Sequence, residues 1–434
     1  MGKNVRARGV LFLVTGLVCL LSSVPVWAAE PALPLPLSGV IEYSLQHNGD
    51  LQSYREEKGI FDAGKRKAKL LPNPTLDVEA GTGALTGNRA ESMLSVGISQ
   101  EFLLAGKRGK RLAVAERELD VYRYRLADKE RLVREEVKTL FYDLMLAEQR
   151  LALADRSLAL NRKLVEVSQA RLAAGDIPEL EMNLVKVELS RSEASRIALE
   201  KAVHQSQEKL STLAALPAGT QYTNSGSSPA ASMLTTSLAD LKQQALDRRP
   251  DIKAMEAERG GSEAAVCLAR AEGVPNLTAG VALWRDTKSM KIDGLESIDE
   301  TYTLGLRLSM PIPVFNHNQA GVQEARARQN SAESRLLTAI RNAEREVETA
   351  YASYLSSEKI LSLYKTDIIP QLEENLSLTE EAWRLGEAGI LAVIQEQKKF
   401  FEVSENYLMV LYNRQIALVQ LDAAVATELN GGKQ

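Results

Sequence analysis

The sequence predicts a mainly α fold with a membrane β part, in which one unit of two strands and a long helical hairpin occurs twice. Three observations predict this. Apolar and small residues recur every three or four positions through residues 107–174, which keeps one face of a helix apolar. Through residues 92–104, apolar residues alternate with small or polar ones, as in a strand. The same order of segments then occurs again after residue 237.

Residues 1–28 have the pattern of a signal peptide that is removed on export. Basic residues precede an apolar segment at residues 10–21, which is shorter than a membrane-spanning helix, and small residues suit cleavage after Ala28. A short membrane anchor is the alternative, but Pro25 and the polar residues after it fit cleavage better. Cys19 lacks the small preceding residue of a lipoprotein signal, so we expect no lipid anchor.

Charge and cysteine content narrow the class of protein. The chain carries a formal net charge of −4, and removing the three basic residues of the signal changes it to −7. An acidic export product has no global attraction for nucleic acid. Only Cys267 remains after cleavage, so an internal disulfide is impossible. No second long apolar run follows the signal, so a membrane location would depend on strands.

The first unit spans residues 29–217. Short helices end at the break Leu71-Pro72-Asn73-Pro74, because proline cannot continue a helix. Strands are predicted at about 74–84 and 92–104, each with one apolar face. A helical hairpin over residues 107–216 follows and turns at Gly175. Its first helix would be on the order of 100 Å long, which indicates a protein that bridges a distance.

The second unit spans residues 238–429, after a Gly- and Ser-rich linker at 218–237, and a tail at 430–434 ends the chain. Its strands are predicted at about 275–285 and 300–312. Its helical hairpin, over 318–429, is expected to kink near Pro370. The pair Ala388-Gly389 matches Ala174-Gly175 at the turn.

Four strands per chain imply assembly, since an open sheet edge is not tolerated in lipid. Transmembrane barrels begin at about eight strands, so two chains would supply about eight and three chains about 12. The small or polar strand face suits a wet lumen and the apolar face suits lipid. A β-sandwich edge carried on a coiled coil is the soluble alternative. Aromatic residues near the strand ends are expected at the membrane interface: Phe102, Trp284, Tyr302 and Phe315.

The duplicated halves, strand pairs and long hairpins resemble the TolC family of outer-membrane efflux proteins over essentially the whole mature chain. Two segments, 71–76 (LPNPTL) and 100–108 (QEFLLAGKR), are most similar to its heavy-metal cation branch. The resemblance implies a homotrimer with a 12-stranded β-barrel in the outer membrane, joined to a 12-helix periplasmic α-barrel tunnel. It also implies a periplasmic adaptor (a membrane fusion protein) and a proton-driven inner-membrane pump as partners.

The resemblance also assigns roles to the two hairpin turns, which would form the tunnel tip that contacts the adaptor. The tip residues in this sequence are Arg171, Leu172, Ala174, Gly175, Asp176, Arg384, Leu385, Gly389 and Ile390. Relatives carry acidic residues just inside the tip that gate the pore. This sequence departs from that pattern after Gly389, and the candidates for the gate are Glu179, Glu181, Gln395 and Glu396.

No catalytic or cofactor-binding motif is present, and His47, His204 and His317 are too scattered to predict a metal site within one chain. Basic runs at 65–69 and 107–111 flank the first strand pair and are expected to meet outer-membrane lipid head groups, with simple solvation as the alternative. They lack the interleaved aromatic residues of a nucleic-acid site.

The expected function is a passive, non-enzymatic exit duct of a tripartite efflux system that conducts heavy-metal cations. A duct for organic toxins or drugs is one alternative. A periplasmic coiled-coil adaptor is another, but an adaptor would carry a β domain between the arms of a hairpin, where these turns offer only a few residues.

Overall fold

The structure, a computed structural model, describes residues 35–85, 87, 89–217, 220, 236–292 and 295–429. The predicted signal peptide, almost all of the predicted linker and the tail lie outside the described residues. The elements of the first half are α1 (Leu37–His47), α2 (Gly49–Glu56), α3 (Lys58–Lys69), β1 (Thr75–Thr82), a 3₁₀ turn (Gly83–Leu85), β2 (Ser92–Phe102), α4 (Lys107–Ala174) and α5 (Glu179–Ala214). Those of the second half are α6 (Leu238–Arg248), α7 (Pro250–Glu272), β3 (Leu277–Ile292), β4 (Leu295–Ser309), α8 (Gln319–Leu363), a π-helical turn (Tyr364–Ile368), α9 (Ile369–Arg384) and α10 (Ile390–Val425).

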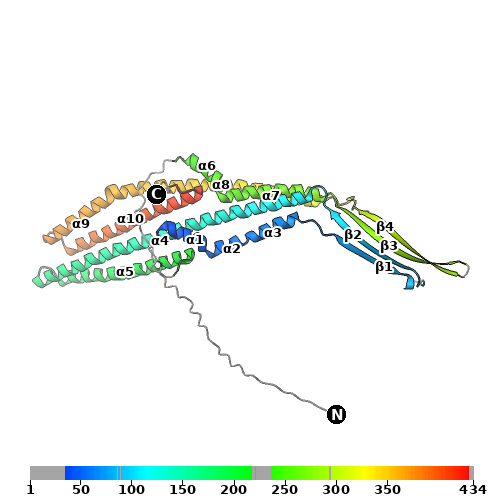
Figure 1. Ribbon diagram of the computed structural model, residues 1–434. Helices are drawn as coiled ribbons and strands as arrows, with labels where there is room; N and C mark the ends of the chain where they lie inside the picture. Colours follow the sequence, from blue (N-terminus) through cyan, green and yellow to red (C-terminus); the bar gives the residue numbers. More distant parts are fainter. Residues whose placement is uncertain are drawn as a thin grey trace, which may run out of the picture.

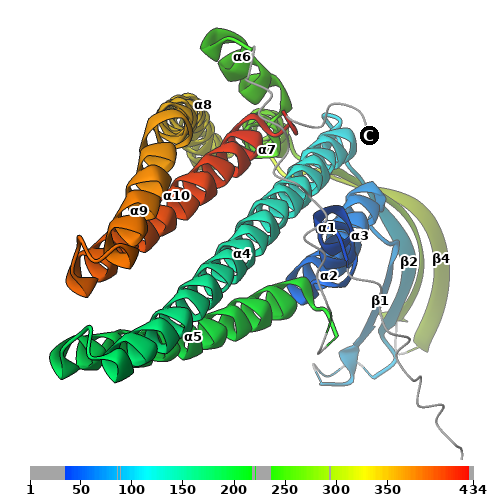
Figure 2. The ribbon, with the colours of Figure 1, turned by 90° about the vertical axis from the view of Figure 1, so that its left-hand side faces the viewer.

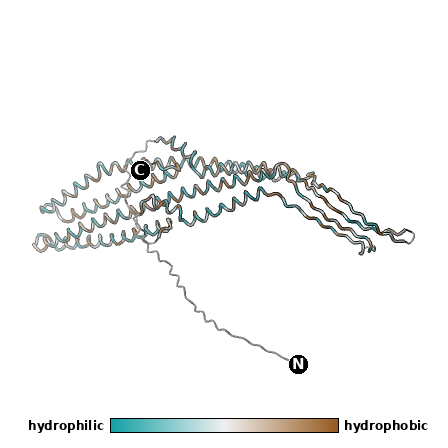
Figure 3. Tube along the Cα trace, viewed as in Figure 1, coloured by the Kyte–Doolittle hydropathy of each residue, from teal (hydrophilic) through white to brown (hydrophobic). Residues whose placement is uncertain are grey.

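The molecule is elongated, with the helices at one end and the sheet extending from the other (Figure 1). Helix α4 contains 68 residues, so it is about 100 Å long. The α4–α5 hairpin and the hairpin formed by α8, α9 and α10 run in the same direction away from the sheet (Figures 1 and 2). Hydrophobic residues recur along the helices and strands rather than gathering in one globular centre (Figure 3).

The two halves bury equivalent short helices in the same way. Val40 of α1 is fully buried in a cluster with Leu144 of α4 and Leu210 of α5. Leu241 of α6 is fully buried in a cluster that contains Leu421 of α10 and residues of α8. In each half, a short helix before the strands therefore covers the seam between the two long helices that follow them.

Proline affects α8–α9 as expected. Pro370 has no N–H to donate to a carbonyl one turn earlier, and the π-helical turn Tyr364–Ile368 lies directly before α9, in which Pro370 is the second residue. The extra residue of a π turn accommodates the missing bond. The predicted interruption of this long helix is confirmed.

The four strands form one antiparallel sheet in the order β1-β2-β3-β4. The second strand pair is longer than predicted, since β3 runs to Ile292 and β4 begins at Leu295. Residues 286–299 lack the apolar alternation that marks a strand, which is why the sequence placed a loop there. The two strands nevertheless pair through their backbones there, and Lys288 lies opposite Asp299, a cross-strand pair of opposite charges that is stabilising.

The register gives the sheet two different faces. One face is apolar and exposed, with Leu304, Leu306 and Leu308 of β4 between 73% and 83% exposed. The other face carries small or polar residues, because Ser95, Gly97 and Ser99 alternate with the apolar residues of β2. No described element packs against the apolar face in the way a second sheet would (Figures 1 and 2).

Trp284 was expected among the aromatic residues of a membrane interface, and the register places it elsewhere. It pairs with Ser95 on β2 and Thr303 on β4, so it lies on the small-residue face. A Cβ built on Gly305 would lie 2.6 Å from the indole ring, so the ring covers this glycine. A strand places side chains on alternate sides, so position 284 falls on the opposite side of the sheet from its neighbours Leu283 and Arg285.

Gly280→Ala is expected to lower the thermal unfolding midpoint of the purified protein. A Cβ at position 280 would lie 2.7 Å from the carbonyl oxygen of Ile98 and 2.9 Å from the Cβ of Ser99, so β2 or β3 would have to shift. Overpacking of this kind costs about 1–3 kcal/mol. Thermal unfolding followed by circular dichroism measures the effect.

Gly81→Ala on β1 is the matched control, because the nearest atom to its added Cβ is the Cβ of Met93 at 3.8 Å, an ordinary contact. Equal unfolding midpoints for the two variants would contradict the close approach of β2 and β3.

Candidate functional site at the ends of the helical hairpins

The α4–α5 hairpin turns at a glycine that its backbone requires. Gly175 has φ of +81°, a left-handed conformation in which a side chain is strained. Its N–H donates to the carbonyl of Leu172 at 3.0 Å, and the N–H of Asp176 donates to the carbonyl of Arg171 at 2.9 Å. These two bonds satisfy the last carbonyls of α4 and close the helix in a Schellman motif. Pro178 then leads directly into α5.

The α9–α10 hairpin turns at Gly386, which has φ of +82°. Its N–H donates to the carbonyl of Trp383 at 3.0 Å, and the N–H of Glu387 donates to the carbonyl of Ala382 at 2.9 Å. The second turn therefore repeats the helix ending of the first, one residue after Leu385.

Gly389 is not the equivalent of Gly175, so this part of the prediction is wrong. Gly389 has φ of −77° and ψ of 158°, an extended conformation almost identical to that of Pro178, and like Pro178 it directly precedes a helix. The sequence comparison matched two Ala-Gly pairs. The glycine equivalent to Gly175 is the one at the end of the helix, because only the residue after the last helical turn must be left-handed.

The two turns contact each other through Arg171 and Trp383. The guanidinium of Arg171 donates from Nη1 to the carbonyl oxygen of Trp383 at 3.0 Å, and its Cζ lies 5.3 Å from the centroid of the indole ring. One arginine of the first hairpin thus binds the last turn of α9 by a charged hydrogen bond and a cation–π contact.

A small apolar core lies beneath this contact. It joins α4, α5, α9 and α10 and consists of Leu164, Val185, Trp383, Ile390, Val393 and Ile394. Ile390, predicted to contact a partner, is only 1% exposed. It therefore supports the turn from inside and presents no surface.

Most of the other predicted tip residues lie on the surface. Arg171 and Leu172 are half-buried, and the exposed ones are Ala174, Gly175, Asp176, Arg384, Leu385 and Gly389. Three large apolar side chains project at the tip, Leu180, Leu385 and Leu391, with exposed fractions of 69%, 65% and 52%. The sequence reasoning missed Leu180 and Leu391, although both lie one residue inside the start of a helix that follows a turn.

The structure does not bring the four gate candidates together. Glu179 and Gln395 are exposed, whereas Glu181 and Glu396 are half-buried. Glu396 lies 3.8 Å from Lys399 on its own helix. In the described part of the chain, no hydrogen bond or ion pair joins the candidates of α5 to those of α10.

A groove of about 460 Å³ lies between α4, α5 and α10, behind the tip. Its lining is mixed, and two polar contacts cross it: Lys398 of α10 forms an ion pair with Glu188 of α5 at 2.5 Å, and Asn161 of α4 donates to Ser192 of α5 at 2.6 Å. Lys398–Glu188 links the two hairpins. No pattern in the sequence predicts this pair, because the two residues are far apart in the chain.

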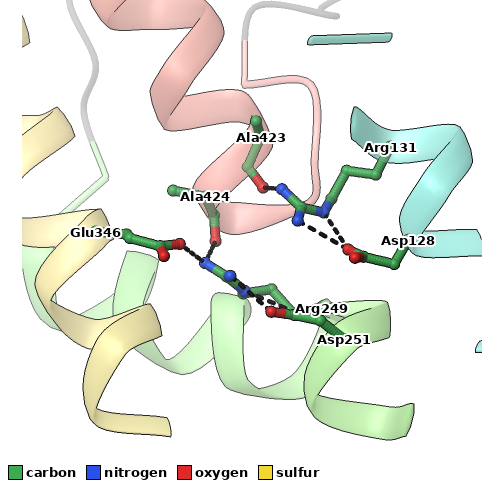
Figure 4. A network of polar contacts seen from close by, with 7 residues as sticks. All are labelled: Asp128, Arg131, Arg249, Asp251, Glu346, Ala423 and Ala424. Atoms are coloured by element: carbon green, nitrogen blue, oxygen red, sulfur yellow. Dashed lines mark hydrogen bonds and ion pairs between the residues drawn. The ribbon is translucent and has the colours of Figure 1, made fainter. Parts of the chain in front are cut away.

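Two arginines hold the other end of α10 (Figure 4). Arg131 of α4 donates to the carbonyl oxygen of Ala423 at 2.9 Å, and Arg249, between α6 and α7, donates to that of Ala424 at 3.3 Å. Both carbonyls belong to the last turn of α10, at the negative end of the helix dipole. The carbonyl of Ala423 also accepts from the N–H of Ala426 at 3.2 Å. We call this arrangement the α10 clamp.

Each arginine of the α10 clamp is itself held by carboxylates (Figure 4). Arg249 is 4% exposed, and its Nε and Nη2 donate to both carboxylate oxygens of Asp251 at 3.0 and 2.8 Å. It also donates to Glu346 of α8 at 2.5 Å. Arg131 donates to Asp128 of α4 at 2.9 Å. The clamp therefore connects α10 with α4 of the first repeat and with α7 and α8 of the second.

Burial and pairing with a basic residue shift the pKa of a carboxyl group in opposite directions. Burial by itself would raise the pKa of Asp251, but the hydrogen bonds and charge of Arg249 outweigh it and lower the pKa. Burial raises the pKa of Asp422, whose carboxylate lies 3.3 Å from Lys138 of α4, because desolvation there outweighs the pull of the lysine. Acidification would thus protonate Asp422 before Asp251.

Comparison with known proteins identifies the family. The family model described as "Outer membrane efflux protein" matches residues 40–216 and 241–427, one segment in each repeat. The chain belongs to this family.

Several members and relatives are similar over most of the chain. The cobalt-zinc-cadmium resistance protein CzcC of Cupriavidus metallidurans is 24% identical, over 92% of each chain. The nickel-cobalt-cadmium resistance protein NccC of Alcaligenes xylosoxydans is 27% identical, over 75% of this chain and 71% of its own. The pyoverdine export outer membrane protein OpmQ of Pseudomonas aeruginosa is 24% identical, over 86% and 76%. A crystal structure of CusC has a TM-score of 0.73 at 19% identity, covering 90% of this chain and 91% of that one.

These comparisons confirm the family predicted from the sequence and its heavy-metal resistance relatives. The mainly helical fold matches that of the solved efflux channels. The family consists of efflux channels and not of enzymes.

Within the residues that the structure describes, no helix is both long and apolar enough to span a membrane. The same residues include no group of three or more His, Cys, Asp or Glu side chains placed to hold a metal ion.

Trp383→Ala is expected to lower the free energy of unfolding by about 3 kcal/mol, because it removes a buried aromatic side chain and the ring beneath Arg171. Leu385→Ala, two residues away on the exposed surface, is expected to stay within about 0.5 kcal/mol of the wild type. Urea unfolding of both variants measures the difference. Equal free energies of unfolding for the two variants would contradict the apolar core around Trp383.

Arg249→Gln is expected to lower the free energy of unfolding by about 2 kcal/mol at pH 7, because it leaves Asp251 and the end of α10 without their charged donor. The folded pKa of Asp251 is lowered, so this stabilisation is present above the unfolded pKa, near about 3.9, and is lost as pH falls through the folded pKa. The gap between wild type and variant should therefore narrow below about pH 4.

Arg248→Gln is the neighbouring control, since Arg248 is exposed and donates to Thr427. A gap between wild type and Arg249→Gln that stays constant down to pH 2 would rule out the proposed role of Asp251.

Proposed function

We propose that this protein is the outer-membrane exit duct of a tripartite efflux system and that it conducts heavy-metal cations passively. Three copies form a 12-stranded barrel continuous with a 12-helix periplasmic tunnel. A periplasmic adaptor docks at the tip, and a proton-driven inner-membrane pump supplies the energy.

The observation that carries the proposal is the sheet. Among the described residues, no strand pairs with the outer edge of β1 or of β4, and the apolar face of the sheet is exposed. An open sheet with an apolar face is stable in lipid only if its edges are paired with those of other copies. Four strands per copy reach about 12 in a trimer, and a barrel wider than about eight strands leaves room for a wet lumen. The small or polar face of the sheet suits that lumen.

The tip supports the docking part of the proposal. Leu180, Leu385 and Leu391 are exposed at two turns, each of which is closed by one left-handed glycine. Exposed apolar side chains on a fixed frame suit a protein–protein contact. Family membership argues against the adaptor alternative.

Metal cations are the first choice of substrate, because CzcC and NccC are named for resistance to cobalt, zinc, nickel and cadmium. An organic substrate is the second candidate, favoured by the similarity to OpmQ, which is named for pyoverdine export. Selectivity for metals would reside in the pump, since a duct that held its cargo tightly would release it slowly.

The purified protein is expected to be trimeric in detergent and to conduct ions in planar bilayers. Deletion of its gene should sensitise cells to at least one divalent metal. A monomeric, non-conducting protein would refute the duct. A conducting trimer whose deletion sensitises cells to organic compounds and to no metal would instead establish the organic substrate.

The double variant Leu180→Asp/Leu385→Asp is expected to stay trimeric and conducting but to fail to restore resistance to the deletion strain, because it introduces charge into the proposed docking surface. Leu378→Asp is the matched control, since Leu378 is 61% exposed on α9 and lies away from the turn. Full resistance with the double variant would place the docking surface elsewhere.

A further inference from the structure

The end of α3 and the start of α4 lie where the helices of the first repeat meet the sheet (Figure 1), and their sequences form a basic patch. It consists of Lys65, Arg66, Lys67, Lys69, Lys107, Arg108, Lys110 and Arg111, and the segments 65–69 and 107–111 contain no acidic residue. The end of α3 and the start of α4 bring the two segments together, because Lys65 of α3 forms an ion pair with Glu116 of α4 at 2.9 Å.

Internal partners account for only part of this charge. Besides Lys65, Arg111 lies 3.6 Å from Glu272, and Lys107 is buried and donates to the side-chain oxygen of Asn276 at 2.6 Å. The other five basic side chains form no ion pair with a carboxylate in the described part of the chain. Four of them are exposed and Lys110 is half-buried: Arg66, Lys67, Lys69, Arg108 and Lys110.

The side-chain charges at the start of α4 have the opposite sign to those that the helix dipole favours. The N-terminus of a helix carries a partial positive charge and favours acidic residues in its first turn. Helix α4 has no acidic residue there and no side-chain cap, and it begins with Lys107 and Arg108. Basic residues at this position do not stabilise the helix, so their presence indicates a functional role such as binding an anion.

The second repeat lacks the patch, although it repeats the fold. The last turn of α7 has one basic residue, Arg270, and ends with Glu272, whereas the last turn of α3 has three. The first residues of α8, from Gln319 to Gln323, include no basic residue. The charge is therefore not a requirement of the helix–sheet junction, because the other junction forms without it.

Apolar side chains adjoin the patch on the side of the sheet. Leu70 and Leu71 directly follow the end of α3 and are 68% and 62% exposed, and Phe102 at the end of β2 is 50% exposed. Exposed apolar side chains next to basic ones suit the border between the acyl chains and the head groups of a membrane. At this border, long basic side chains extend their charge toward phosphate.

We propose that the basic patch binds the phosphate of an anionic glycerophospholipid in the leaflet that faces the helices. The inference rests on the proposed function for its membrane. It adds that the lipid sites are discrete: because only the first repeat carries the patch, a trimer has three separate sites rather than a continuous basic ring.

The test uses the full-length protein in neutral detergent and short-chain dioctanoyl-phosphatidylglycerol, with dioctanoyl-phosphatidylcholine as the uncharged comparison. Native mass spectrometry counts bound lipids and chains in the same particle. We expect one preferred phosphatidylglycerol per chain. Affinity should be roughly tenfold or more above that for phosphatidylcholine, since each basic residue near an anionic head group contributes about a fivefold factor.

The quadruple variant Arg66→Gln/Lys67→Gln/Arg108→Gln/Lys110→Gln should lose this preference. Its matched control makes the same change of charge at exposed lysines elsewhere on the helices: Lys163→Gln, Lys186→Gln, Lys201→Gln and Lys359→Gln. If the first quadruple variant does not fold, Arg108→Gln/Lys110→Gln is measured in its place. The charge-preserving Arg66→Lys/Arg108→Lys should bind like the wild type.

Equal binding of the two lipids by the wild type would overturn the proposal, as would equal losses in the two quadruple variants. Inorganic phosphate that competes as well as phosphatidylglycerol at equal concentration would show a bare anion site and would also overturn it. The chain count is read separately from the lipid count. A monomer that still binds one phosphatidylglycerol would therefore defeat the trimer and leave the lipid site standing.

Discussion

The last turn of α10 is the point on which the arrangement of the two repeats depends. Two of its carbonyls accept hydrogen bonds from Arg131 of the first repeat and from Arg249 of the second. Arg249 is buried, so its charge has to be matched within the protein, and Asp251 and Glu346 match it. Carbonyls, arginines and carboxylates thus stabilise one another, and removing Arg249 would take the charged donor from Asp251 and from the carbonyl of Ala424.

The long hairpins extend from this clamp and meet again at their far ends. There the contact is of another kind, an apolar core under Trp383 with Arg171 across it. These two contacts hold the hairpins together at Arg131 and at Arg171 of α4, and a groove lined by both polar and apolar side chains lies between them. A wall of this kind suits a tunnel, because its shape does not depend on a single globular core.

Periodicity and turn chemistry predicted most of the fold. Helices with an apolar face, strands with alternating residues and proline breaks are encoded by near neighbours, so the duplication was visible in the sequence. Equivalence at the turns was not, and Gly389 was matched in place of Gly386. Both glycines lie in the same short turn, and only the position of the last hydrogen-bonded turn of α9 shows which of them is left-handed.

The sequence by itself determined the family, the order of elements and the two faces of each strand, because these depend on spacing along the chain. The tertiary structure decided which distant residues meet. It paired Lys398 with Glu188, placed Arg249 at the end of α10 and buried Ile390. Such pairs are set by how whole helices and strands pack, and no local pattern records them.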